Sequence, residues 1–224
     1  MNKIITICFT FYILMSTFHI AEGQDTIYVP QDYDLIQQAI DASVNGNIVL
    51  VDTGVYEENI NFNGKAITVK SYYDPPEKSD SSYIYNTIID GSKPVDTNKA
   101  SVVTFPIWSD TNSVISGFTI INGKGTLLGN RLGGGILCFD GGKIIHNRII
   151  NNTVVHDEHA LGSGIWAEGL TSSCFVIKNN IIENNQLENT NSNYMCWGTI
   201  GLHTGNIIVK NNIIRSNTAK LLII

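Results

Sequence analysis

The sequence predicts an all-β fold, a right-handed parallel β-helix (a solenoid) of three sheets with a short capping helix at its N-terminal end. The first observation behind this prediction is a recurring Ile pair close to Asn. It appears as "GFTIINGKG" (117–125), "HNRIINNT" (146–153), "KNNIIENN" (178–185) and "KNNIIRSN" (210–217). The second is a Gly-containing strand before each of the last three pairs: "GGGIL" (133–137), "GSGIW" (162–166) and "GTIGL" (198–202). Successive pairs are 29, 32 and 32 residues apart, which is too short for propeller blades of about forty residues.

These repeats are short β-branched strands separated by Gly and Asn, without a helical period. One such unit has no way to bury its own apolar face, but units stacked at the strand spacing of about 4.8 Å do bury it. Asn tolerates the left-handed conformation of a corner, and its amide can stack on the Asn of the coil below. Because side chains alternate along a strand, one Ile of each pair should point inward. We expect Ile150, Ile182 and Ile214 to form this inward column.

The N-terminal half predicts the cap and the first coils. The stretch "PQDYDLIQQAIDAS" (30–43) has the pattern of an amphipathic helix, and we place the cap at about residues 30–45. Its apolar face holds Leu35, Ile36, Ala39 and Ile40. Residues 48–73 then predict strands broken at glycines, and residues 74–86 predict a surface loop. We expect residues 24–224 to form a single domain.

The first 23 residues have the pattern of a secretory signal peptide. Lys3 precedes an apolar stretch, and the small residues Ala21 and Gly23 stand before a cleavage point at Gln24. An uncleaved anchor is the alternative. The expected protein is therefore secreted, extracellular or at the cell surface, without a membrane span in its mature part. The last residues, "TAKLLII" (218–224), lack a polar cap and predict a truncated solenoid; a short strand docked over the last coil is the alternative.

Composition and charge exclude several classes of partner. The chain has 20 Gly, 15% charged residues and a formal net charge of −6, which persists when Lys3 and Glu22 leave together with the leader. Without Lys/Arg clusters, this balance disfavours nucleic acid and anionic lipid surfaces. Three cysteines remain in the mature chain, Cys138, Cys174 and Cys196. Buried free thiols are favoured, and one Cys174–Cys196 bridge is the alternative.

The N-terminal stretch resembles the opening of the pectin lyase-like superfamily. The resemblance lies in residues 27–71, with "GVYEENI" (54–60), followed by "TIIDG" (87–91), and the repeats extend it over most of the mature chain. It is similar to exported bacterial β-helix proteins and implies that fold together with a polysaccharide ligand. The Asp pairs of pectinesterases, the Asp and His motifs of polygalacturonases and the Ca²⁺-binding Asp cluster of pectate lyases do not occur here. The resemblance thus implies the scaffold without a catalytic set, and no cofactor unless the protein is a Ca²⁺-dependent lyase.

One cluster of titratable residues stands outside the strand pattern: His156, Asp157, Glu158 and His159. Imidazole and carboxylate groups suit metal binding or proton transfer, which makes these four residues the catalytic candidates. The alternative is a solvated polar loop, because four consecutive loop residues rarely converge on one ion. We predict no metal site from them.

Three segments that follow successive Ile pairs should project side by side from one edge of the solenoid, at residues 122–133, 151–162 and 183–198. The carbohydrate-binding candidates that they carry are Lys124, Arg131, Glu188, Tyr194 and Trp197. Aromatic stacking faces beside hydrogen-bonding charges are what an oligosaccharide requires. The alternative is that these are ordinary variable loops, with Trp197 packed against the sheet edge.

The expected function is that of an exported, monomeric β-helix protein that binds cell-surface or environmental polysaccharide without intact catalytic motifs. One alternative is a polysaccharide lyase or hydrolase that acts on acidic glycans such as pectin. A second is a structural passenger or adhesin segment of a longer surface protein.

Overall fold

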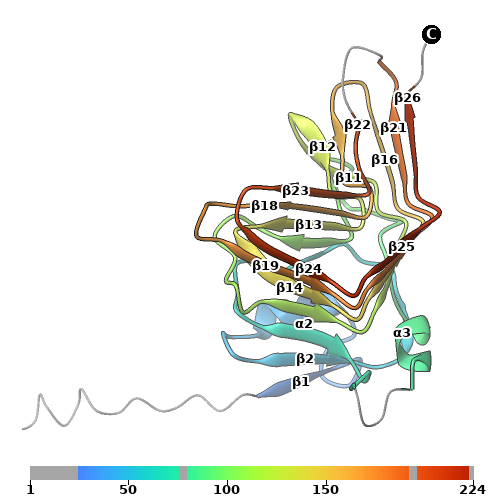
Figure 1. The fold of residues 1–224 in the computed structure, drawn as a ribbon. Coiled ribbons are helices and arrows are strands. Elements are labelled where there is room, and N and C mark those ends of the chain that lie inside the picture. Colours follow the sequence, from blue (N-terminus) through green and yellow to red (C-terminus); the bar gives the residue numbers. More distant parts are fainter. Residues whose placement is uncertain (1–24, 76–79, 192–195, 222–224) are drawn as a thin grey trace, which may run out of the picture.

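The chain folds as a parallel β-solenoid, which confirms the predicted fold class (Figure 1). The computed structural model describes residues 25–75, 80–191 and 196–221. Three main sheets run along the solenoid, and each coil contributes one strand to each sheet in turn. Sheet A contains β1 (Thr26–Val29), β2 (Ile48–Val51), β5 (Thr68–Ser71), β9 (Val114–Ser116), β14 (Gly141–Ile145), β19 (Cys174–Lys178) and β24 (Asn206–Lys210).

Sheets B and C complete the three-sided cross-section. Sheet B contains β3 (Gly54–Tyr56), β6 (Thr87–Asp90), β10 (Thr119–Ile121), β15 (Arg148–Ile150), β20 (Ile181–Glu183) and β25 (Ile213–Arg215). Sheet C contains β4 (Ile60–Asn61), β8 (Val103–Phe105), β13 (Ile136–Phe139), β18 (Ile165–Glu168) and β23 (Ile200–His203). All pairings within these three sheets are parallel, so each residue stacks on its counterpart in the next coil.

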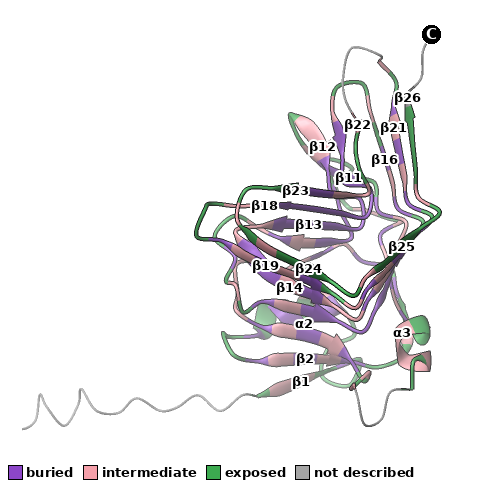
Figure 2. Cartoon of the chain, in the orientation of Figure 1, coloured by how far each residue is buried: buried purple, intermediate pink, exposed green. Residues whose placement is uncertain are grey.

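The core consists of columns of buried apolar residues on the three sheets. Figure 2 shows the buried residues in purple along these strands. In sheet B the column runs through Tyr56, Ile89, Ile120, Ile149 and Ile182, all of them buried. No described segment packs over the open end of the last coil. Its inward side chains therefore remain accessible, and Ile214 is 52% exposed.

The predicted inward column was right for Ile182 and Ile214 but wrong for Ile150. Ile149 stacks on Ile182, whereas Ile150 is paired with Glu183 and lies outside the main core cluster, although it is buried too. The reason is the position of each pair after the corner. Arg148 occupies the outward position that Ile181 fills one coil later, so the two Ile pairs differ in register by one residue.

The two residues of an Asn pair have different roles at a corner. The first residue takes a left-handed conformation, as at Asn179 (φ 58°) and Asn184 (φ 56°). The second joins a buried ladder of amides, one ladder at each of two corners. These ladders are Asn147–Asn180–Asn212 and Asn152–Asn185–Asn217. The predicted Asn ladder is confirmed, but the left-handed residue is the neighbour of the stacked one.

Helix α2 (Ile36–Ala42) covers the N-terminal end of the solenoid, inside the predicted range. The helix residues Ile36, Ala39 and Ile40 are fully buried, whereas Leu35 precedes the helix and is 43% exposed. The Glu58 carboxylate accepts the Ile36 and Gln37 backbone N–H groups, each at 2.9 Å. Glu58 thereby satisfies donors that a helix start leaves unpaired.

The segment predicted as a surface loop between β5 and β6 contains a short helix, α3 (Ser82–Asn86). It lies against sheet B, where the Thr119 hydroxyl donates to the Ile84 carbonyl at 2.7 Å. Tyr85 follows on the same helix and stacks beneath the Arg148 guanidinium at 5.3 Å.

The three segments after the Ile pairs project from one side of the solenoid as predicted, but their described parts form strands where the sequence predicts loops (Figure 1). We call the resulting pair of small sheets the arm. Sheet D contains β7 (Lys99–Ala100), β11 (Gly125–Leu128), β12 (Asn130–Leu132), β17 (Ala160–Leu161) and β22 (Cys196–Trp197). Sheet E contains β16 (Thr153–His156), β21 (Gln186–Asn189) and β26 (Thr218–Leu221). The arm has a small core of its own, formed by Val154, Ala160, Leu187 and Cys196.

Cys138, Cys174 and Cys196 are free thiols in this structure, and the last two are only partly buried. Cys138 is fully buried, and burial raises the pKa of its thiol far above the ordinary range. The predicted leader, residues 1–23, lies outside the described residues. Within them, no helix has the length and apolarity that crossing a membrane requires.

Glu183 carries a charge network on the outer face of sheet B, and this network predicts a loss of stability in acid. Its carboxylate contacts Arg215 at 2.7 Å and Arg148 at 3.0 Å, and these two guanidinium groups, Arg215 foremost, lower the pKa of Glu183. Because the pKa is lowered on folding, the ionised carboxylate stabilises the folded state at pH values above its unfolded pKa of about 4.3. This stabilisation disappears as the pH falls through the folded pKa. The free energy of unfolding of the wild type, measured in urea, should fall steeply below about pH 4.5. That of Glu183→Gln should fall less steeply. Equal pH slopes for the two proteins would contradict this assignment.

Candidate functional site

Several hollows of the described surface follow one another along the outer face of sheet C. Three of them share lining residues and form one continuous groove. The polar end meets the middle at Asn61, Lys99 and Thr104. The middle meets the aromatic end at Ile107, Leu128 and Phe139. The groove crosses five strands, a length of roughly 19 Å at the usual strand spacing.

Strand parity explains which residues face the groove. Along β18, Ile165 and Ala167 point into the core, so Trp166 and Glu168 point outward. Sheet D of the arm borders the groove with Leu128, Leu132, Leu161 and Trp197. Its alternate residues, including Ala160 and Cys196, face sheet E.

The aromatic end, about 550 Å³ in volume, contains two tryptophans in contact. The ring centroids of Trp166 and Trp197 are 6.3 Å apart and tilted by 43°. Trp166 is buried, whereas Trp197 is 45% exposed and presents ring surface to the groove. Gly201 makes room for the Trp166 ring, because a Cβ at that position would lie 2.1 Å from a ring carbon.

Glu168 connects the tryptophans to a histidine. One carboxylate oxygen accepts the Trp166 indole N–H at 3.0 Å, and the other lies 3.2 Å from His203 Nδ1. The His203 ring also stacks on Trp166, with centroids 6.4 Å apart. Both carboxylate oxygens are therefore engaged in positioning neighbouring rings.

The middle of the groove, about 380 Å³, is mainly apolar. Leu137 and Phe139 of β13 form part of its floor, and Leu127 and Leu128 of the β11–β12 hairpin face it from the arm. Its polar lining residues contribute the smaller part of the surface: Asn61, Asn98, Lys99, Thr104 and Thr126.

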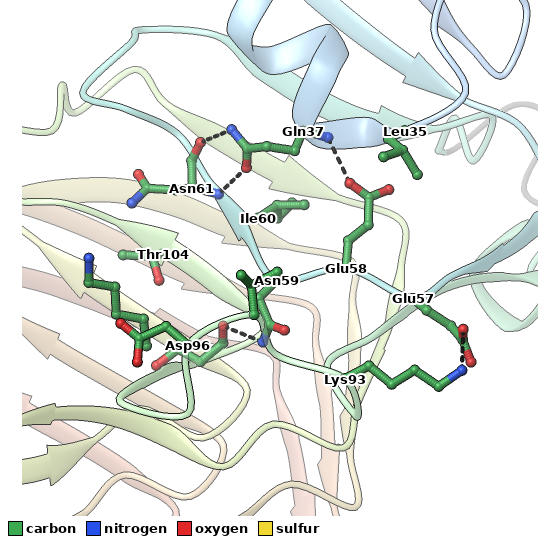
Figure 3. Close-up of a pocket in the computed structure, with 13 residues that line it drawn as sticks. Leu35, Gln37, Glu57, Glu58, Asn59, Ile60, Asn61, Lys93, Asp96 and Thr104 are labelled. Carbon is green, nitrogen blue, oxygen red and sulfur yellow. Dashed lines mark hydrogen bonds and ion pairs between the residues drawn. The ribbon is translucent and has the colours of Figure 1, made fainter.

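The polar end, about 410 Å³, lies beside the capping helix (Figure 3). Gln37 holds its rim through paired hydrogen bonds with the Asn61 backbone, at 2.7 and 3.1 Å. Lys93 forms an ion pair with Glu57 at 2.7 Å. The Asn59 side-chain oxygen is buried and has no hydrogen-bond partner among the described residues.

The structure does not bring all of the carbohydrate-binding candidates together. Trp197 lies in the groove. Lys124 and Arg131 line a separate hollow of about 330 Å³ together with Thr97, Thr153 and Val155, which we call the basic hollow. Arg131 donates there to the Thr97 and Gly125 carbonyls at 3.2 and 3.0 Å.

The remaining candidates lie away from the groove or outside the described residues. Glu188 is on sheet E and alternates with the inward-pointing Leu187, so it faces away from the core of the arm. Tyr194 is not among the described residues. Its role stays a prediction.

The His156–His159 cluster is an ordered turn at the end of β16. His156 Nδ1 accepts the Glu158 backbone N–H at 3.1 Å, and its Nε2 lies 3.7 Å from the Asp157 carboxylate. The Glu158 carbonyl accepts the Asn189 side-chain amide. Nowhere in the described ranges do three His, Cys, Asp or Glu side chains group so as to hold a metal ion. A catalytic role for these four residues stays untested.

Glu168 and His203 are the site residues that sequence reasoning missed, although the repeats contain the signal. "GSGIWAE" and "GTIGLH" align at Ile165 and Ile200. Three residues further on, this alignment places Glu168 beside His203, as the structure does.

Comparisons with protein-family models, curated proteins and solved structures find no match for this chain.

Proposed function

We propose that the protein is an exported β-solenoid protein of the pectin lyase-like type that binds polysaccharide in the groove on sheet C. The observation that carries the proposal is the exposed Trp197 ring beside Trp166, at one end of a groove several strands long. Flat aromatic surface suits the apolar face of a sugar ring, and amphipathic aromatic rings are frequent at wet binding sites. The length of the groove suits a chain polymer better than a single sugar.

Binding without turnover is favoured over catalysis by the same residues. A glycosidase generally uses two carboxyl groups placed on either side of the scissile bond. Among the residues that line the aromatic end, Glu168 is the single carboxylate, and both of its oxygens are engaged. The leader-like sequence at residues 1–23 supports export.

Replacing Trp197 with Ala should abolish most of the retention by an immobilised polysaccharide, because it removes the exposed stacking surface. Affinity electrophoresis across a panel of plant and microbial polysaccharides measures this retention. Trp108→Ala is the matched control, since Trp108 is 79% exposed but does not line the groove. Equal retention of the wild type and Trp197→Ala, or no retention by any polysaccharide in the panel, would remove the proposed function.

A further inference from the structure

We infer that the groove takes a neutral, hydroxyl-rich polysaccharide and discriminates against uronate polymers. The inference rests on the proposed function and narrows its ligand class. It follows from where the charged and the uncharged polar side chains lie along the groove.

The aromatic end has no cation to pair with a ligand carboxylate. Its titratable lining residues are Glu168 and His203, and no Lys or Arg is among the described residues that line it. The imidazole lies against the Glu168 carboxylate at 3.2 Å, so any positive charge on it is already paired. A uronate carboxylate placed here would meet the negative charge of Glu168 at close range.

The polar end carries more negative than positive charge. Its charged lining residues are three carboxylates and two ammonium groups: Glu57, Glu58, Asp96, Lys93 and Lys99. Lys93 is already neutralised by Glu57. Lys99 is the remaining cation, and the Asp96 carboxylate shares its hollow. The formal net charge of −6 on the whole chain adds a long-range repulsion of polyanions.

The uncharged polar groups that line the groove suit hydroxyls. The amide side chains of Asn59 and Asn61 line the polar end. Thr104, which lines both the polar end and the middle, adds a group that donates and accepts. Neutral sugar hydroxyls supply both donors and acceptors and carry no charge that would have to be desolvated.

Apart from the ion-paired Lys93, the groove has one ammonium group among its described lining residues, Lys99, whereas two cations, Lys124 and Arg131, lie together in the basic hollow. An acidic glycan that did bind this protein should therefore use that hollow. This difference in position separates the two ligand classes in an experiment.

The test uses calorimetric titration with neutral hexasaccharides (gluco-, manno- and xylo-oligomers), hexagalacturonate and the methyl ester of hexagalacturonate. The last two differ in charge while sharing a backbone. We expect a neutral oligomer to bind with an affinity that is insensitive to added salt and is lost in Trp197→Ala. Wherever the galacturonate pair binds, the methyl ester should bind at least about fivefold more tightly than the free acid at low salt. Asp96→Asn should narrow that preference.

Tighter binding of the free acid, weakened by salt and abolished by Lys124→Ala with Arg131→Ala, would overturn the inference while leaving polysaccharide binding in place. If the Asp96→Asn variant preferred the methyl ester over the free acid as strongly as the wild type does, this result would also count against the inference. If none of these oligomers and no polysaccharide binds, the proposed function fails, and the inference fails with it.

Discussion

Replacing Asn180 with Ala is expected to lower the free energy of unfolding by about 3 kcal/mol. The Asn180 side chain is buried at the centre of a ladder. Its oxygen accepts the Asn147 backbone N–H at 2.9 Å, and its amide nitrogen donates to the Ile144 carbonyl at 2.8 Å. Ala would leave the buried Asn147 N–H unpaired, which costs about 1–3 kcal/mol, and would also remove the side-chain hydrogen bonds to the Ile144 carbonyl and to Asn212, each of which contributes about 1 kcal/mol.

Urea unfolding followed by circular dichroism measures this difference. Asn98→Ala is the matched control, because Asn98 is exposed and lies outside both ladders. Its unfolding midpoint should stay close to that of the wild type. A loss for Asn180→Ala no larger than the loss for Asn98→Ala would show that the ladder contributes little.

Gly123→Ala should be at least as destabilising, for a steric reason. A Cβ at residue 123 would lie 1.9 Å from the Gly134 carbonyl oxygen, a backbone atom without freedom to rotate away. Gly123 also donates its N–H to the buried Asn152 side chain at 2.8 Å, so a shift of this corner would disturb the second ladder. Overpacking of this kind costs about 1–3 kcal/mol, and the disturbed hydrogen bond adds to it.

Gly54→Ala is the control for this substitution. Both glycines have ordinary backbone angles, but a Cβ at residue 54 would meet only the Tyr56 ring, at 3.4 Å. Thermal unfolding should therefore show a large drop in the melting temperature for Gly123→Ala and a small change for Gly54→Ala. Similar melting temperatures for the two variants would contradict the close approach of residues 123 and 134.

The sequence was sufficient to predict the solenoid because each coil repeats the same local chemistry. Ile fills the core, Asn turns the corner, and Gly permits close backbone approach at residues 133–135, 162 and 164. The predicted inward position of Ile150 was wrong because the repeats were aligned on their Ile pairs. These pairs stand at different distances from their corners, so Ile149 and not Ile150 stacks on Ile182. The left-handed residue that precedes each ladder Asn is the better reference point: His146, Asn179 and Asn211.

The arm and the groove were less predictable. Segments such as 122–133 contain Gly, Asn and Lys, which are typical of loops, but stacking on equivalent segments of the next coils converts them into strands. Which face of each strand meets sheet C depends on parity within the arm. Trp197 and Arg131 thereby fall on different faces, although the sequence places both in equivalent projecting segments.

Fluorescence titration of the tryptophans with a bound polysaccharide shows whether the ligand lies in the groove, because the chain has 3 Trp residues and two of them line the groove. We expect a saturable change in emission that persists in Trp108→Phe and disappears in Trp197→Phe. A change that persists in Trp197→Phe and disappears in Trp108→Phe would place the ligand outside the groove and contradict polysaccharide binding on sheet C.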